Sequence, residues 1–97
     1  MKKIISTVVL LIPIVSLANE SMIKVCLASA YTLQKNYHVN HGSYADNIQQ
    51  LSWGNTDCIK NFEPSITKAT QSQFEVHMSS KSSKWTIDQN KNMVKIN

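Results

Sequence analysis

The chain has 97 residues, enough for one small domain and too few for a multidomain enzyme or a large cofactor-binding fold. Ten basic residues, all of them lysine, outweigh six acidic ones and give a net charge of +4. Without Lys2 and Lys3 the charge falls from +4 to +2. A mild excess of this size does not by itself indicate a nucleic-acid-binding protein.

Residues 1–18 have the pattern of a secretory signal peptide. Lys2 and Lys3 form a positive start, Ile4–Val15 is apolar, and Ser16 and Ala18 place small residues before a cleavage site. The apolar run is shorter than the ~20 residues that a membrane-spanning helix needs. Contact with a membrane is therefore expected only if this segment stays uncleaved. We expect residues 19–97 to form one exported domain, in the bacterial periplasm or outside the cell.

Two cysteines, Cys26 and Cys58, lie in the part of the chain that follows the signal. In an oxidising compartment an even number of cysteines usually forms disulfides. Closing a loop of about 30 residues stabilises a fold by roughly 3–4 kcal/mol in the chain-entropy model. A free catalytic thiol is the alternative, but it needs a neighbouring base, and no nearby residue indicates one. The pair predicts a structural disulfide.

The exported part begins with a predicted helix from Asn19 to about Asn40. Gly42 is placed to end it in a left-handed conformation. Apolar side chains recur at steps of three and four residues and define one buried face. These residues are Ile23, Cys26, Leu27, Ala30, Leu33 and Tyr37.

After this helix the pattern predicts a turn and a short helix, Asp46–Leu51, capped by Ser43 or Asp46. Ser52–Asn61 is expected to be an irregular loop. The remainder alternates between apolar and polar residues and predicts strands. The first contains Phe62 and Ile66, at an edge because of Pro64. The later ones are Phe74–Met78, Trp85–Ile87 and Met93–Ile96, with a polar turn at Ser79–Lys84. The predicted fold class is α+β, a long N-terminal helix packed on a three- to four-stranded antiparallel sheet.

Several segments, in this order, resemble the type IV pilin and pseudopilin family. Pilins often carry Gln and Tyr on the helix, then Gly-Ser/Thr-Tyr-Ala and a short helix with Leu. The matching segments here are Ala30–Tyr37, His41–Ala45, Ile48–Leu51, Phe62–Ile66, Phe74–Met78 and Trp85–Lys91. The resemblance implies a pilin-like globular head that works with a type IV pilus or a type II secretion machine.

The N-terminus departs from the pilin pattern. A pilin has a Gly-Phe-Thr-Leu-type processing site, followed by a long apolar helix that carries a Glu. Here no Gly precedes the apolar run, and Glu20 follows it. Both cysteines also lie earlier than the C-terminal disulfide of many pilins. We therefore expect a head released from its filament-forming helix rather than a subunit incorporated by the usual route.

No catalytic, cofactor or metal site is expected. The acidic residues are scattered, and neither glycine belongs to a phosphate-binding loop. His38 and His41 are three residues apart and could share a metal ion only with a third ligand from His77, Asp46 or Asp57. The alternative is that both histidines are solvated near the helix end.

Two loops are the candidate binding surface, because loops held by a rigid scaffold commonly make contacts. The first contains Trp53, Asn55 and Asp57, and the second contains Lys81 and Lys84. Trp53 either anchors a partner protein or caps the core. We expect a protein partner from a pilus or a secretion machine. The alternatives are DNA binding through Lys81 and Lys84, and a small secreted inhibitor or effector on the same scaffold.

Overall fold

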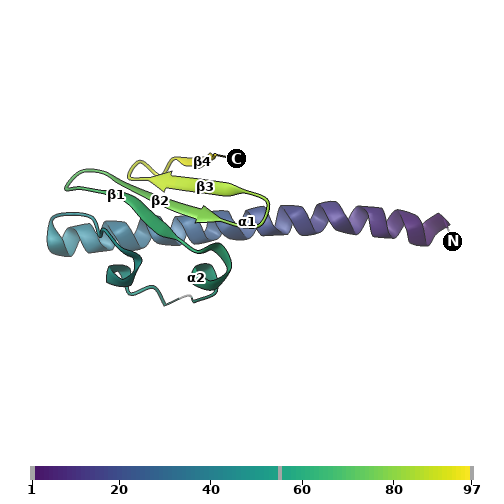
Figure 1. The fold of residues 1–97 in the computed structure, drawn as a ribbon, viewed down its shortest axis with the longest axis horizontal. Helices are drawn as coiled ribbons and strands as arrows, with labels where there is room; N and C mark the ends of the chain where they lie inside the picture. Colours follow the sequence, from purple (N-terminus) through teal and green to yellow (C-terminus); the bar gives the residue numbers. More distant parts are fainter. Residues whose placement is uncertain (1, 55, 97) are drawn as a thin grey trace.

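The structure is a computed structural model that describes the backbone of residues 2–54 and 56–96, with side chains from Glu20 onward. Helix α1 runs from Lys2 to His41. Its first half projects from the domain, whereas its second half lies along the sheet (Figure 1). The helix therefore begins earlier than the predicted Asn19 and runs without a break from the apolar segment into the part of the chain that follows it. It ends at His41, one residue later than predicted, and the following Gly42 has the expected positive φ of 79°.

The buried face of α1 matches the predicted stripe between Ile23 and Ala30. Ile23, Cys26, Leu27 and Ala30 are buried in the core. Further along the helix, Leu33 and Tyr37 are only partly buried, and Gln34 is the fully buried residue instead. This difference arises because the chain after α1 folds back over the helix end. A polar side chain can satisfy the backbone groups that this return buries.

Four antiparallel strands form a meander in the order β1-β2-β3-β4. Their bounds are Ser65–Ala69, Phe74–Ser79, Lys84–Asp88 and Met93–Lys95. The predicted alternation is confirmed, because Phe74, Val76 and Met78 of β2 are buried and their neighbours are not. In β3, Trp85 and Ile87 are likewise buried. These side chains pack against α1, and the opposite face of the sheet is polar.

The connection between α1 and the sheet differs most from the prediction. The short helix is a 3-10 turn, η1 (Ile48–Leu51), and its cap is Asn47 rather than Ser43 or Asp46. The segment predicted as an irregular loop contains helix α2, Thr56–Phe62. Cys58 and Phe62 are four residues apart and are both buried, so one face of α2 joins the core. Phe62 therefore ends a helix and does not begin the first strand.

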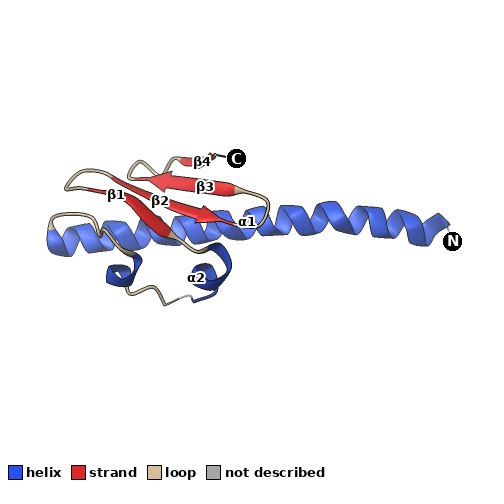
Figure 2. Cartoon of the chain, in the orientation of Figure 1, coloured by secondary structure: helices blue, strands red, loops and turns tan. Residues whose placement is uncertain are grey.

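Figure 2 shows the resulting layers, with the sheet on one side of α1 and with α2 and η1 on another. Strand β1 lies at an edge of the sheet, as the position of Pro64 predicts. The α+β fold class, with the second half of the long helix packed on a four-stranded antiparallel sheet, is thus observed. Among residues 20–54 and 56–96, whose side chains are described, no helical segment is both long enough and apolar enough to cross a membrane.

Candidate functional site

A disulfide between Cys26 of α1 and Cys58 of α2 joins the two helices, as the sequence predicts. Their Cα atoms lie 5.6 Å apart, and the residues are 32 positions apart in the chain. Both cysteines are buried. The bond holds α2 against α1 and is consistent with a secreted or periplasmic protein.

A hollow of about 220 Å³ opens beside this disulfide, between α1 and α2. Its outer wall is apolar and exposed, since Met22 is 51% exposed and Val25 is 64% exposed. Its lining residues are Ser21, Met22, Val25, Cys26, Asp57, Cys58 and Phe62. Apolar side chains that are exposed next to one another, rather than singly, commonly mark a contact surface.

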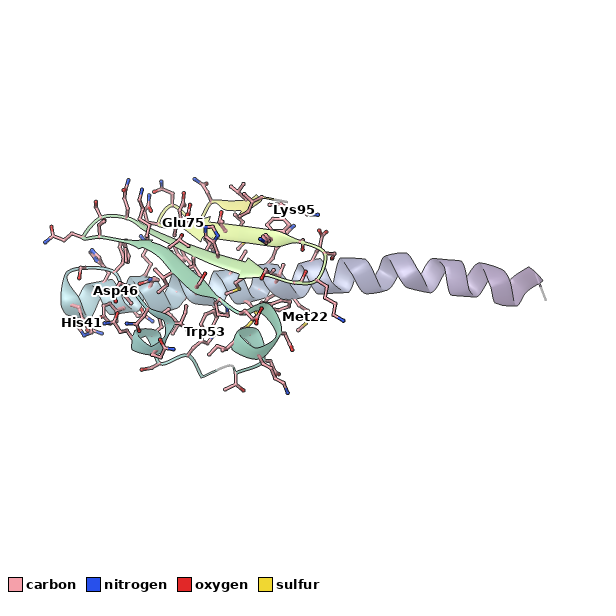
Figure 3. The ribbon with its side chains drawn as sticks, viewed as in Figure 1. Met22, His41, Asp46, Trp53, Glu75 and Lys95 are labelled. Carbon is pink, nitrogen blue, oxygen red and sulfur yellow. A yellow bond between two sulfur atoms is a disulfide. The ribbon has the colours of Figure 1, made fainter. Side chains whose placement is uncertain are left out.

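A second, more open hollow of about 540 Å³ continues along the same side of α1. It is lined by Val25, Ala28, Ser29, Thr32, Leu33 and Trp53. Val25 lines both hollows, so together they form one surface, which we call the α1 groove. Figure 3 shows Met22 and Trp53 on the side of the helix where α2 lies.

Trp53 is one of the five predicted binding residues, and the structure places it mainly in the core. It is 9% exposed and packs in the same cluster as Leu27 and Phe62. Only a small part of its side chain lines the α1 groove. Of the two interpretations that the sequence left open, core capping describes most of this side chain.

The other predicted binding residues are not gathered in one place. Asp57 lies in the first turn of α2 and lines the hollow beside the disulfide. Asn55 lies outside the described residues. Lys81 and Lys84 are exposed at the β2–β3 hairpin, and Lys84 lines a separate hollow on the polar face of the sheet. The structure therefore distributes the two predicted loops over different surfaces.

Polar contacts hold the ends of the fold together. Lys95 donates a hydrogen bond of 2.6 Å to Glu20, which ties β4 to α1 and lowers the pKa of Glu20. Lys24 lies over the ring of Trp85, 4.9 Å from its centre. At the other end of the domain, Lys35 donates to the Tyr44 hydroxyl at 3.0 Å, and this bond raises the pKa of Lys35.

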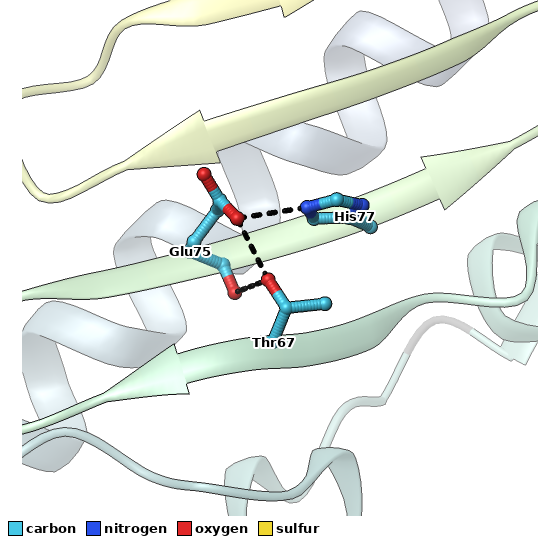
Figure 4. Close-up of polar contacts among 3 residues, drawn as sticks. All are labelled: Thr67, Glu75 and His77. Atoms are coloured by element: carbon cyan, nitrogen blue, oxygen red, sulfur yellow. Dashed lines mark hydrogen bonds and ion pairs between the residues drawn. The ribbon is translucent and has the colours of Figure 1, made fainter. Parts of the chain in front are cut away.

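A polar trio lies on the sheet face opposite α1 (Figure 4). The ring of His77 donates through Nε2 to Oε1 of Glu75 at 2.9 Å, and the hydroxyl of Thr67 donates to the same oxygen at 2.8 Å. The bond from His77, and then the bond from Thr67, holds the pKa of Glu75 below its ordinary value. This arrangement is not a nucleophilic triad, because the hydroxyl contacts the carboxylate rather than the imidazole.

His38 and His41 bind backbone carbonyls rather than facing a common point. His38 Nε2 donates to Gln71 at 2.6 Å, and His41 Nδ1 donates to Tyr37 at 3.0 Å. Among residues whose side chains are described, no group of three or more His, Cys, Asp or Glu is placed to hold a metal ion.

Sequence reasoning missed the most exposed part of the α1 groove. Met22 and Val25 are apolar but fall outside the buried stripe of the helix. The sequence did contain one signal, because Met22 and Val25 are three residues apart and therefore lie on the same side of the helix. Comparison with protein-family models and with curated proteins gives no significant match to this chain.

Proposed function

We propose that this protein is an exported, non-enzymatic binding module of pilin-like architecture, and that its α1 groove binds a protein component of a type IV pilus or a type II secretion machine. The order of elements supports the pilin-like part of the proposal, since a long helix is followed by short helical turns and an antiparallel meander. The disulfide supports export.

The exposed apolar wall of the α1 groove carries the proposal. Met22 and Val25 present apolar area to solvent beside a groove that extends to Trp53. Such a surface gains free energy when a partner removes it from water, at about 25 cal/mol per Å² buried. The larger of its two hollows is open to solvent, which suits a protein segment better than a small molecule that needs enclosure.

Substitution at Val25 tests the proposal against a matched control on the same helix. Val39 is also apolar, is 81% exposed and does not line the groove. We expect Val25→Lys to abolish capture of a pilus or secretion component from envelope extracts, and Val39→Lys to leave capture intact. Equal capture by both variants, or capture of proteins unrelated to either machine, would contradict the proposal.

DNA binding is a second candidate, favoured by the exposure of Lys81 and Lys84 on one hairpin. Lysine contacts phosphates as a point charge, and such binding weakens steeply as salt rises. We expect Lys81→Glu with Lys84→Glu to abolish binding to duplex DNA, measured by fluorescence anisotropy at several salt concentrations. An affinity that changes little between low and physiological salt rules this candidate out.

A further inference from the structure

A third hollow lies away from the α1 groove, on the polar face of the sheet at the β2–β3 hairpin end. It has a volume of about 180 Å³. The lining residues are Glu63, Ser65, His77, Met78, Ser79 and Lys84. Most of these side chains are hydrogen-bond donors, so the chemistry of the hollow differs from that of the apolar groove.

Strand register sets the spacing of the donors. Ser65 lies opposite His77 in the β1–β2 pair, and Ser79 lies opposite Lys84 in the β2–β3 pair. His77 and Ser79 are two residues apart on β2, so their side chains point to the same face. Opposite positions place Cβ atoms about 5 Å apart. Four polar side chains of the sheet therefore line the hollow, which has room for a carboxylate and for the small group that carries it.

The polar trio fixes the orientation of the histidine. Because Nε2 of His77 donates to Glu75, which also accepts from Thr67, the ring cannot turn freely. Nδ1, the second ring nitrogen, has no hydrogen-bond partner among residues 20–54 and 56–96. With the Nε2 hydrogen given to Glu75, Nδ1 of the neutral ring is an acceptor, so the ring forms part of the wall of the hollow and gives no hydrogen bond to a carboxylate.

Charge selects the kind of ligand. Lys84 supplies a permanent positive charge, and the serine hydroxyls supply neutral donors, so an oxyanion is the complementary group. Glu63 also lines the hollow and repels negative charge. A ligand with two negative charges therefore loses more binding free energy to this repulsion than a ligand with one.

We propose that this hollow binds a single carboxylate group beside His77, through Lys84 and the hydroxyls of Ser65 and Ser79. The carboxylate belongs to a small organic acid or to the end of a peptide chain, since both present the same two oxygens. Repulsion from Glu63 favours such a monoanion over a phosphate dianion. The site is independent of the α1 groove and of the function proposed for that groove.

Titration with acetate tests the proposal, using amide NMR spectra of the oxidised protein at fixed pH and ionic strength. Acetate should give saturating shifts at Ser65, His77, Ser79 and Lys84. Acetamide, its neutral counterpart, should give none, and a peptide with a free carboxyl end should compete with acetate. Non-saturating shifts, or an equal response to acetamide, would overturn the proposal.

Two lysine variants and one glutamate variant distinguish binding in the hollow from a general attraction of acetate to surface lysines. Lys84→Ala should weaken acetate binding by about fivefold or more, the size expected for a lost charge-assisted bond. Lys68→Ala, at an exposed lysine on the same sheet face outside the hollow, should leave binding unchanged. Glu63→Gln should tighten acetate binding and admit inorganic phosphate. Equal losses in the two lysine variants, or no gain from Glu63→Gln, would overturn the assignment.

Discussion

Replacement of Gln34 by glutamate should destabilise the fold in a strongly pH-dependent way. Gln34 is 0% exposed, and its amide makes two bonds of 2.8 Å with the backbone of Ala45. Nε2 donates to the carbonyl, and Oε1 accepts from the N–H. A protonated carboxyl group can make the same two bonds, but an ionised one has no hydrogen to give the carbonyl.

The magnitude follows from the free energy needed to keep the introduced carboxyl protonated. Its pKa is about 4.3 when the chain is unfolded, so protonation at pH 7 costs about 3.7 kcal/mol. Burial raises the folded-state pKa of this group. The free energy of unfolding lost in Gln34→Glu should therefore be near zero below pH ~4. It should grow by about 1.4 kcal/mol per pH unit above that pH.

Urea unfolding between acid and neutral pH measures this change. Gln34→Met is the matched control, because it leaves both backbone groups of Ala45 without partners at every pH. Its cost should be about 2–4 kcal/mol and should not depend on pH. A loss of under about 1 kcal/mol at pH 7 for Gln34→Glu, or equal losses at all pH values, would refute the role assigned to this side chain.

Three further predictions concern covalent structure and charge. Replacing Cys26 and Cys58 together by serine should lower the free energy of unfolding, measured by urea unfolding, by about 3–4 kcal/mol, as expected for a 32-residue separation. A loss of under about 1 kcal/mol would contradict this expectation. Intact-mass spectrometry of the exported protein should show a chain beginning at Asn19 that gains two hydrogens on reduction; a chain retaining residues 4–18 would contradict cleavage. The stability difference between wild type and Glu75→Gln should be present at neutral pH and should disappear as the pH falls below the ordinary carboxyl value of 4.5, because the folded-state pKa of Glu75 is lowered. A difference that persists unchanged in acid would show that His77 and Thr67 do not stabilise the ionised carboxylate.

Sequence periodicity predicted the elements whose side chains alternate between core and solvent over several turns or residues. Ile23 and Leu27 mark the core face of α1, and Phe74, Val76 and Met78 mark that of β2. The helical spacing in α1 repeats often enough to exclude a strand, and the two-residue alternation in β2 repeats often enough to exclude a helix.

Short elements carried too little of this signal. In α2, only Cys58 and Phe62 show the four-residue spacing, and the adjacent Pro64 suggested a strand edge. The role of Gln34 depends on Ala45, which reaches it only after the chain turns at Gly42. Such a contact depends on tertiary structure, and helix periodicity does not encode it.

The candidate site was partly predictable for the same reason. Trp53 and Asp57 were found because they lie in one sequence segment. Val25 was missed because it becomes part of a groove only when that segment packs beside α1. The hairpin lysines and the Trp53 segment look like one surface in the sequence, but the sheet places them apart.

Site-specific photo-crosslinking in living cells tests the proposed function most directly. A photoreactive residue at position 25 lies in the α1 groove, and the same residue at position 39 lies on exposed helix outside it. The account predicts a crosslinked product between position 25 and a pilus or secretion component, with no such product from position 39. Products of equal yield at both positions, or none at position 25, would contradict a binding function for the groove.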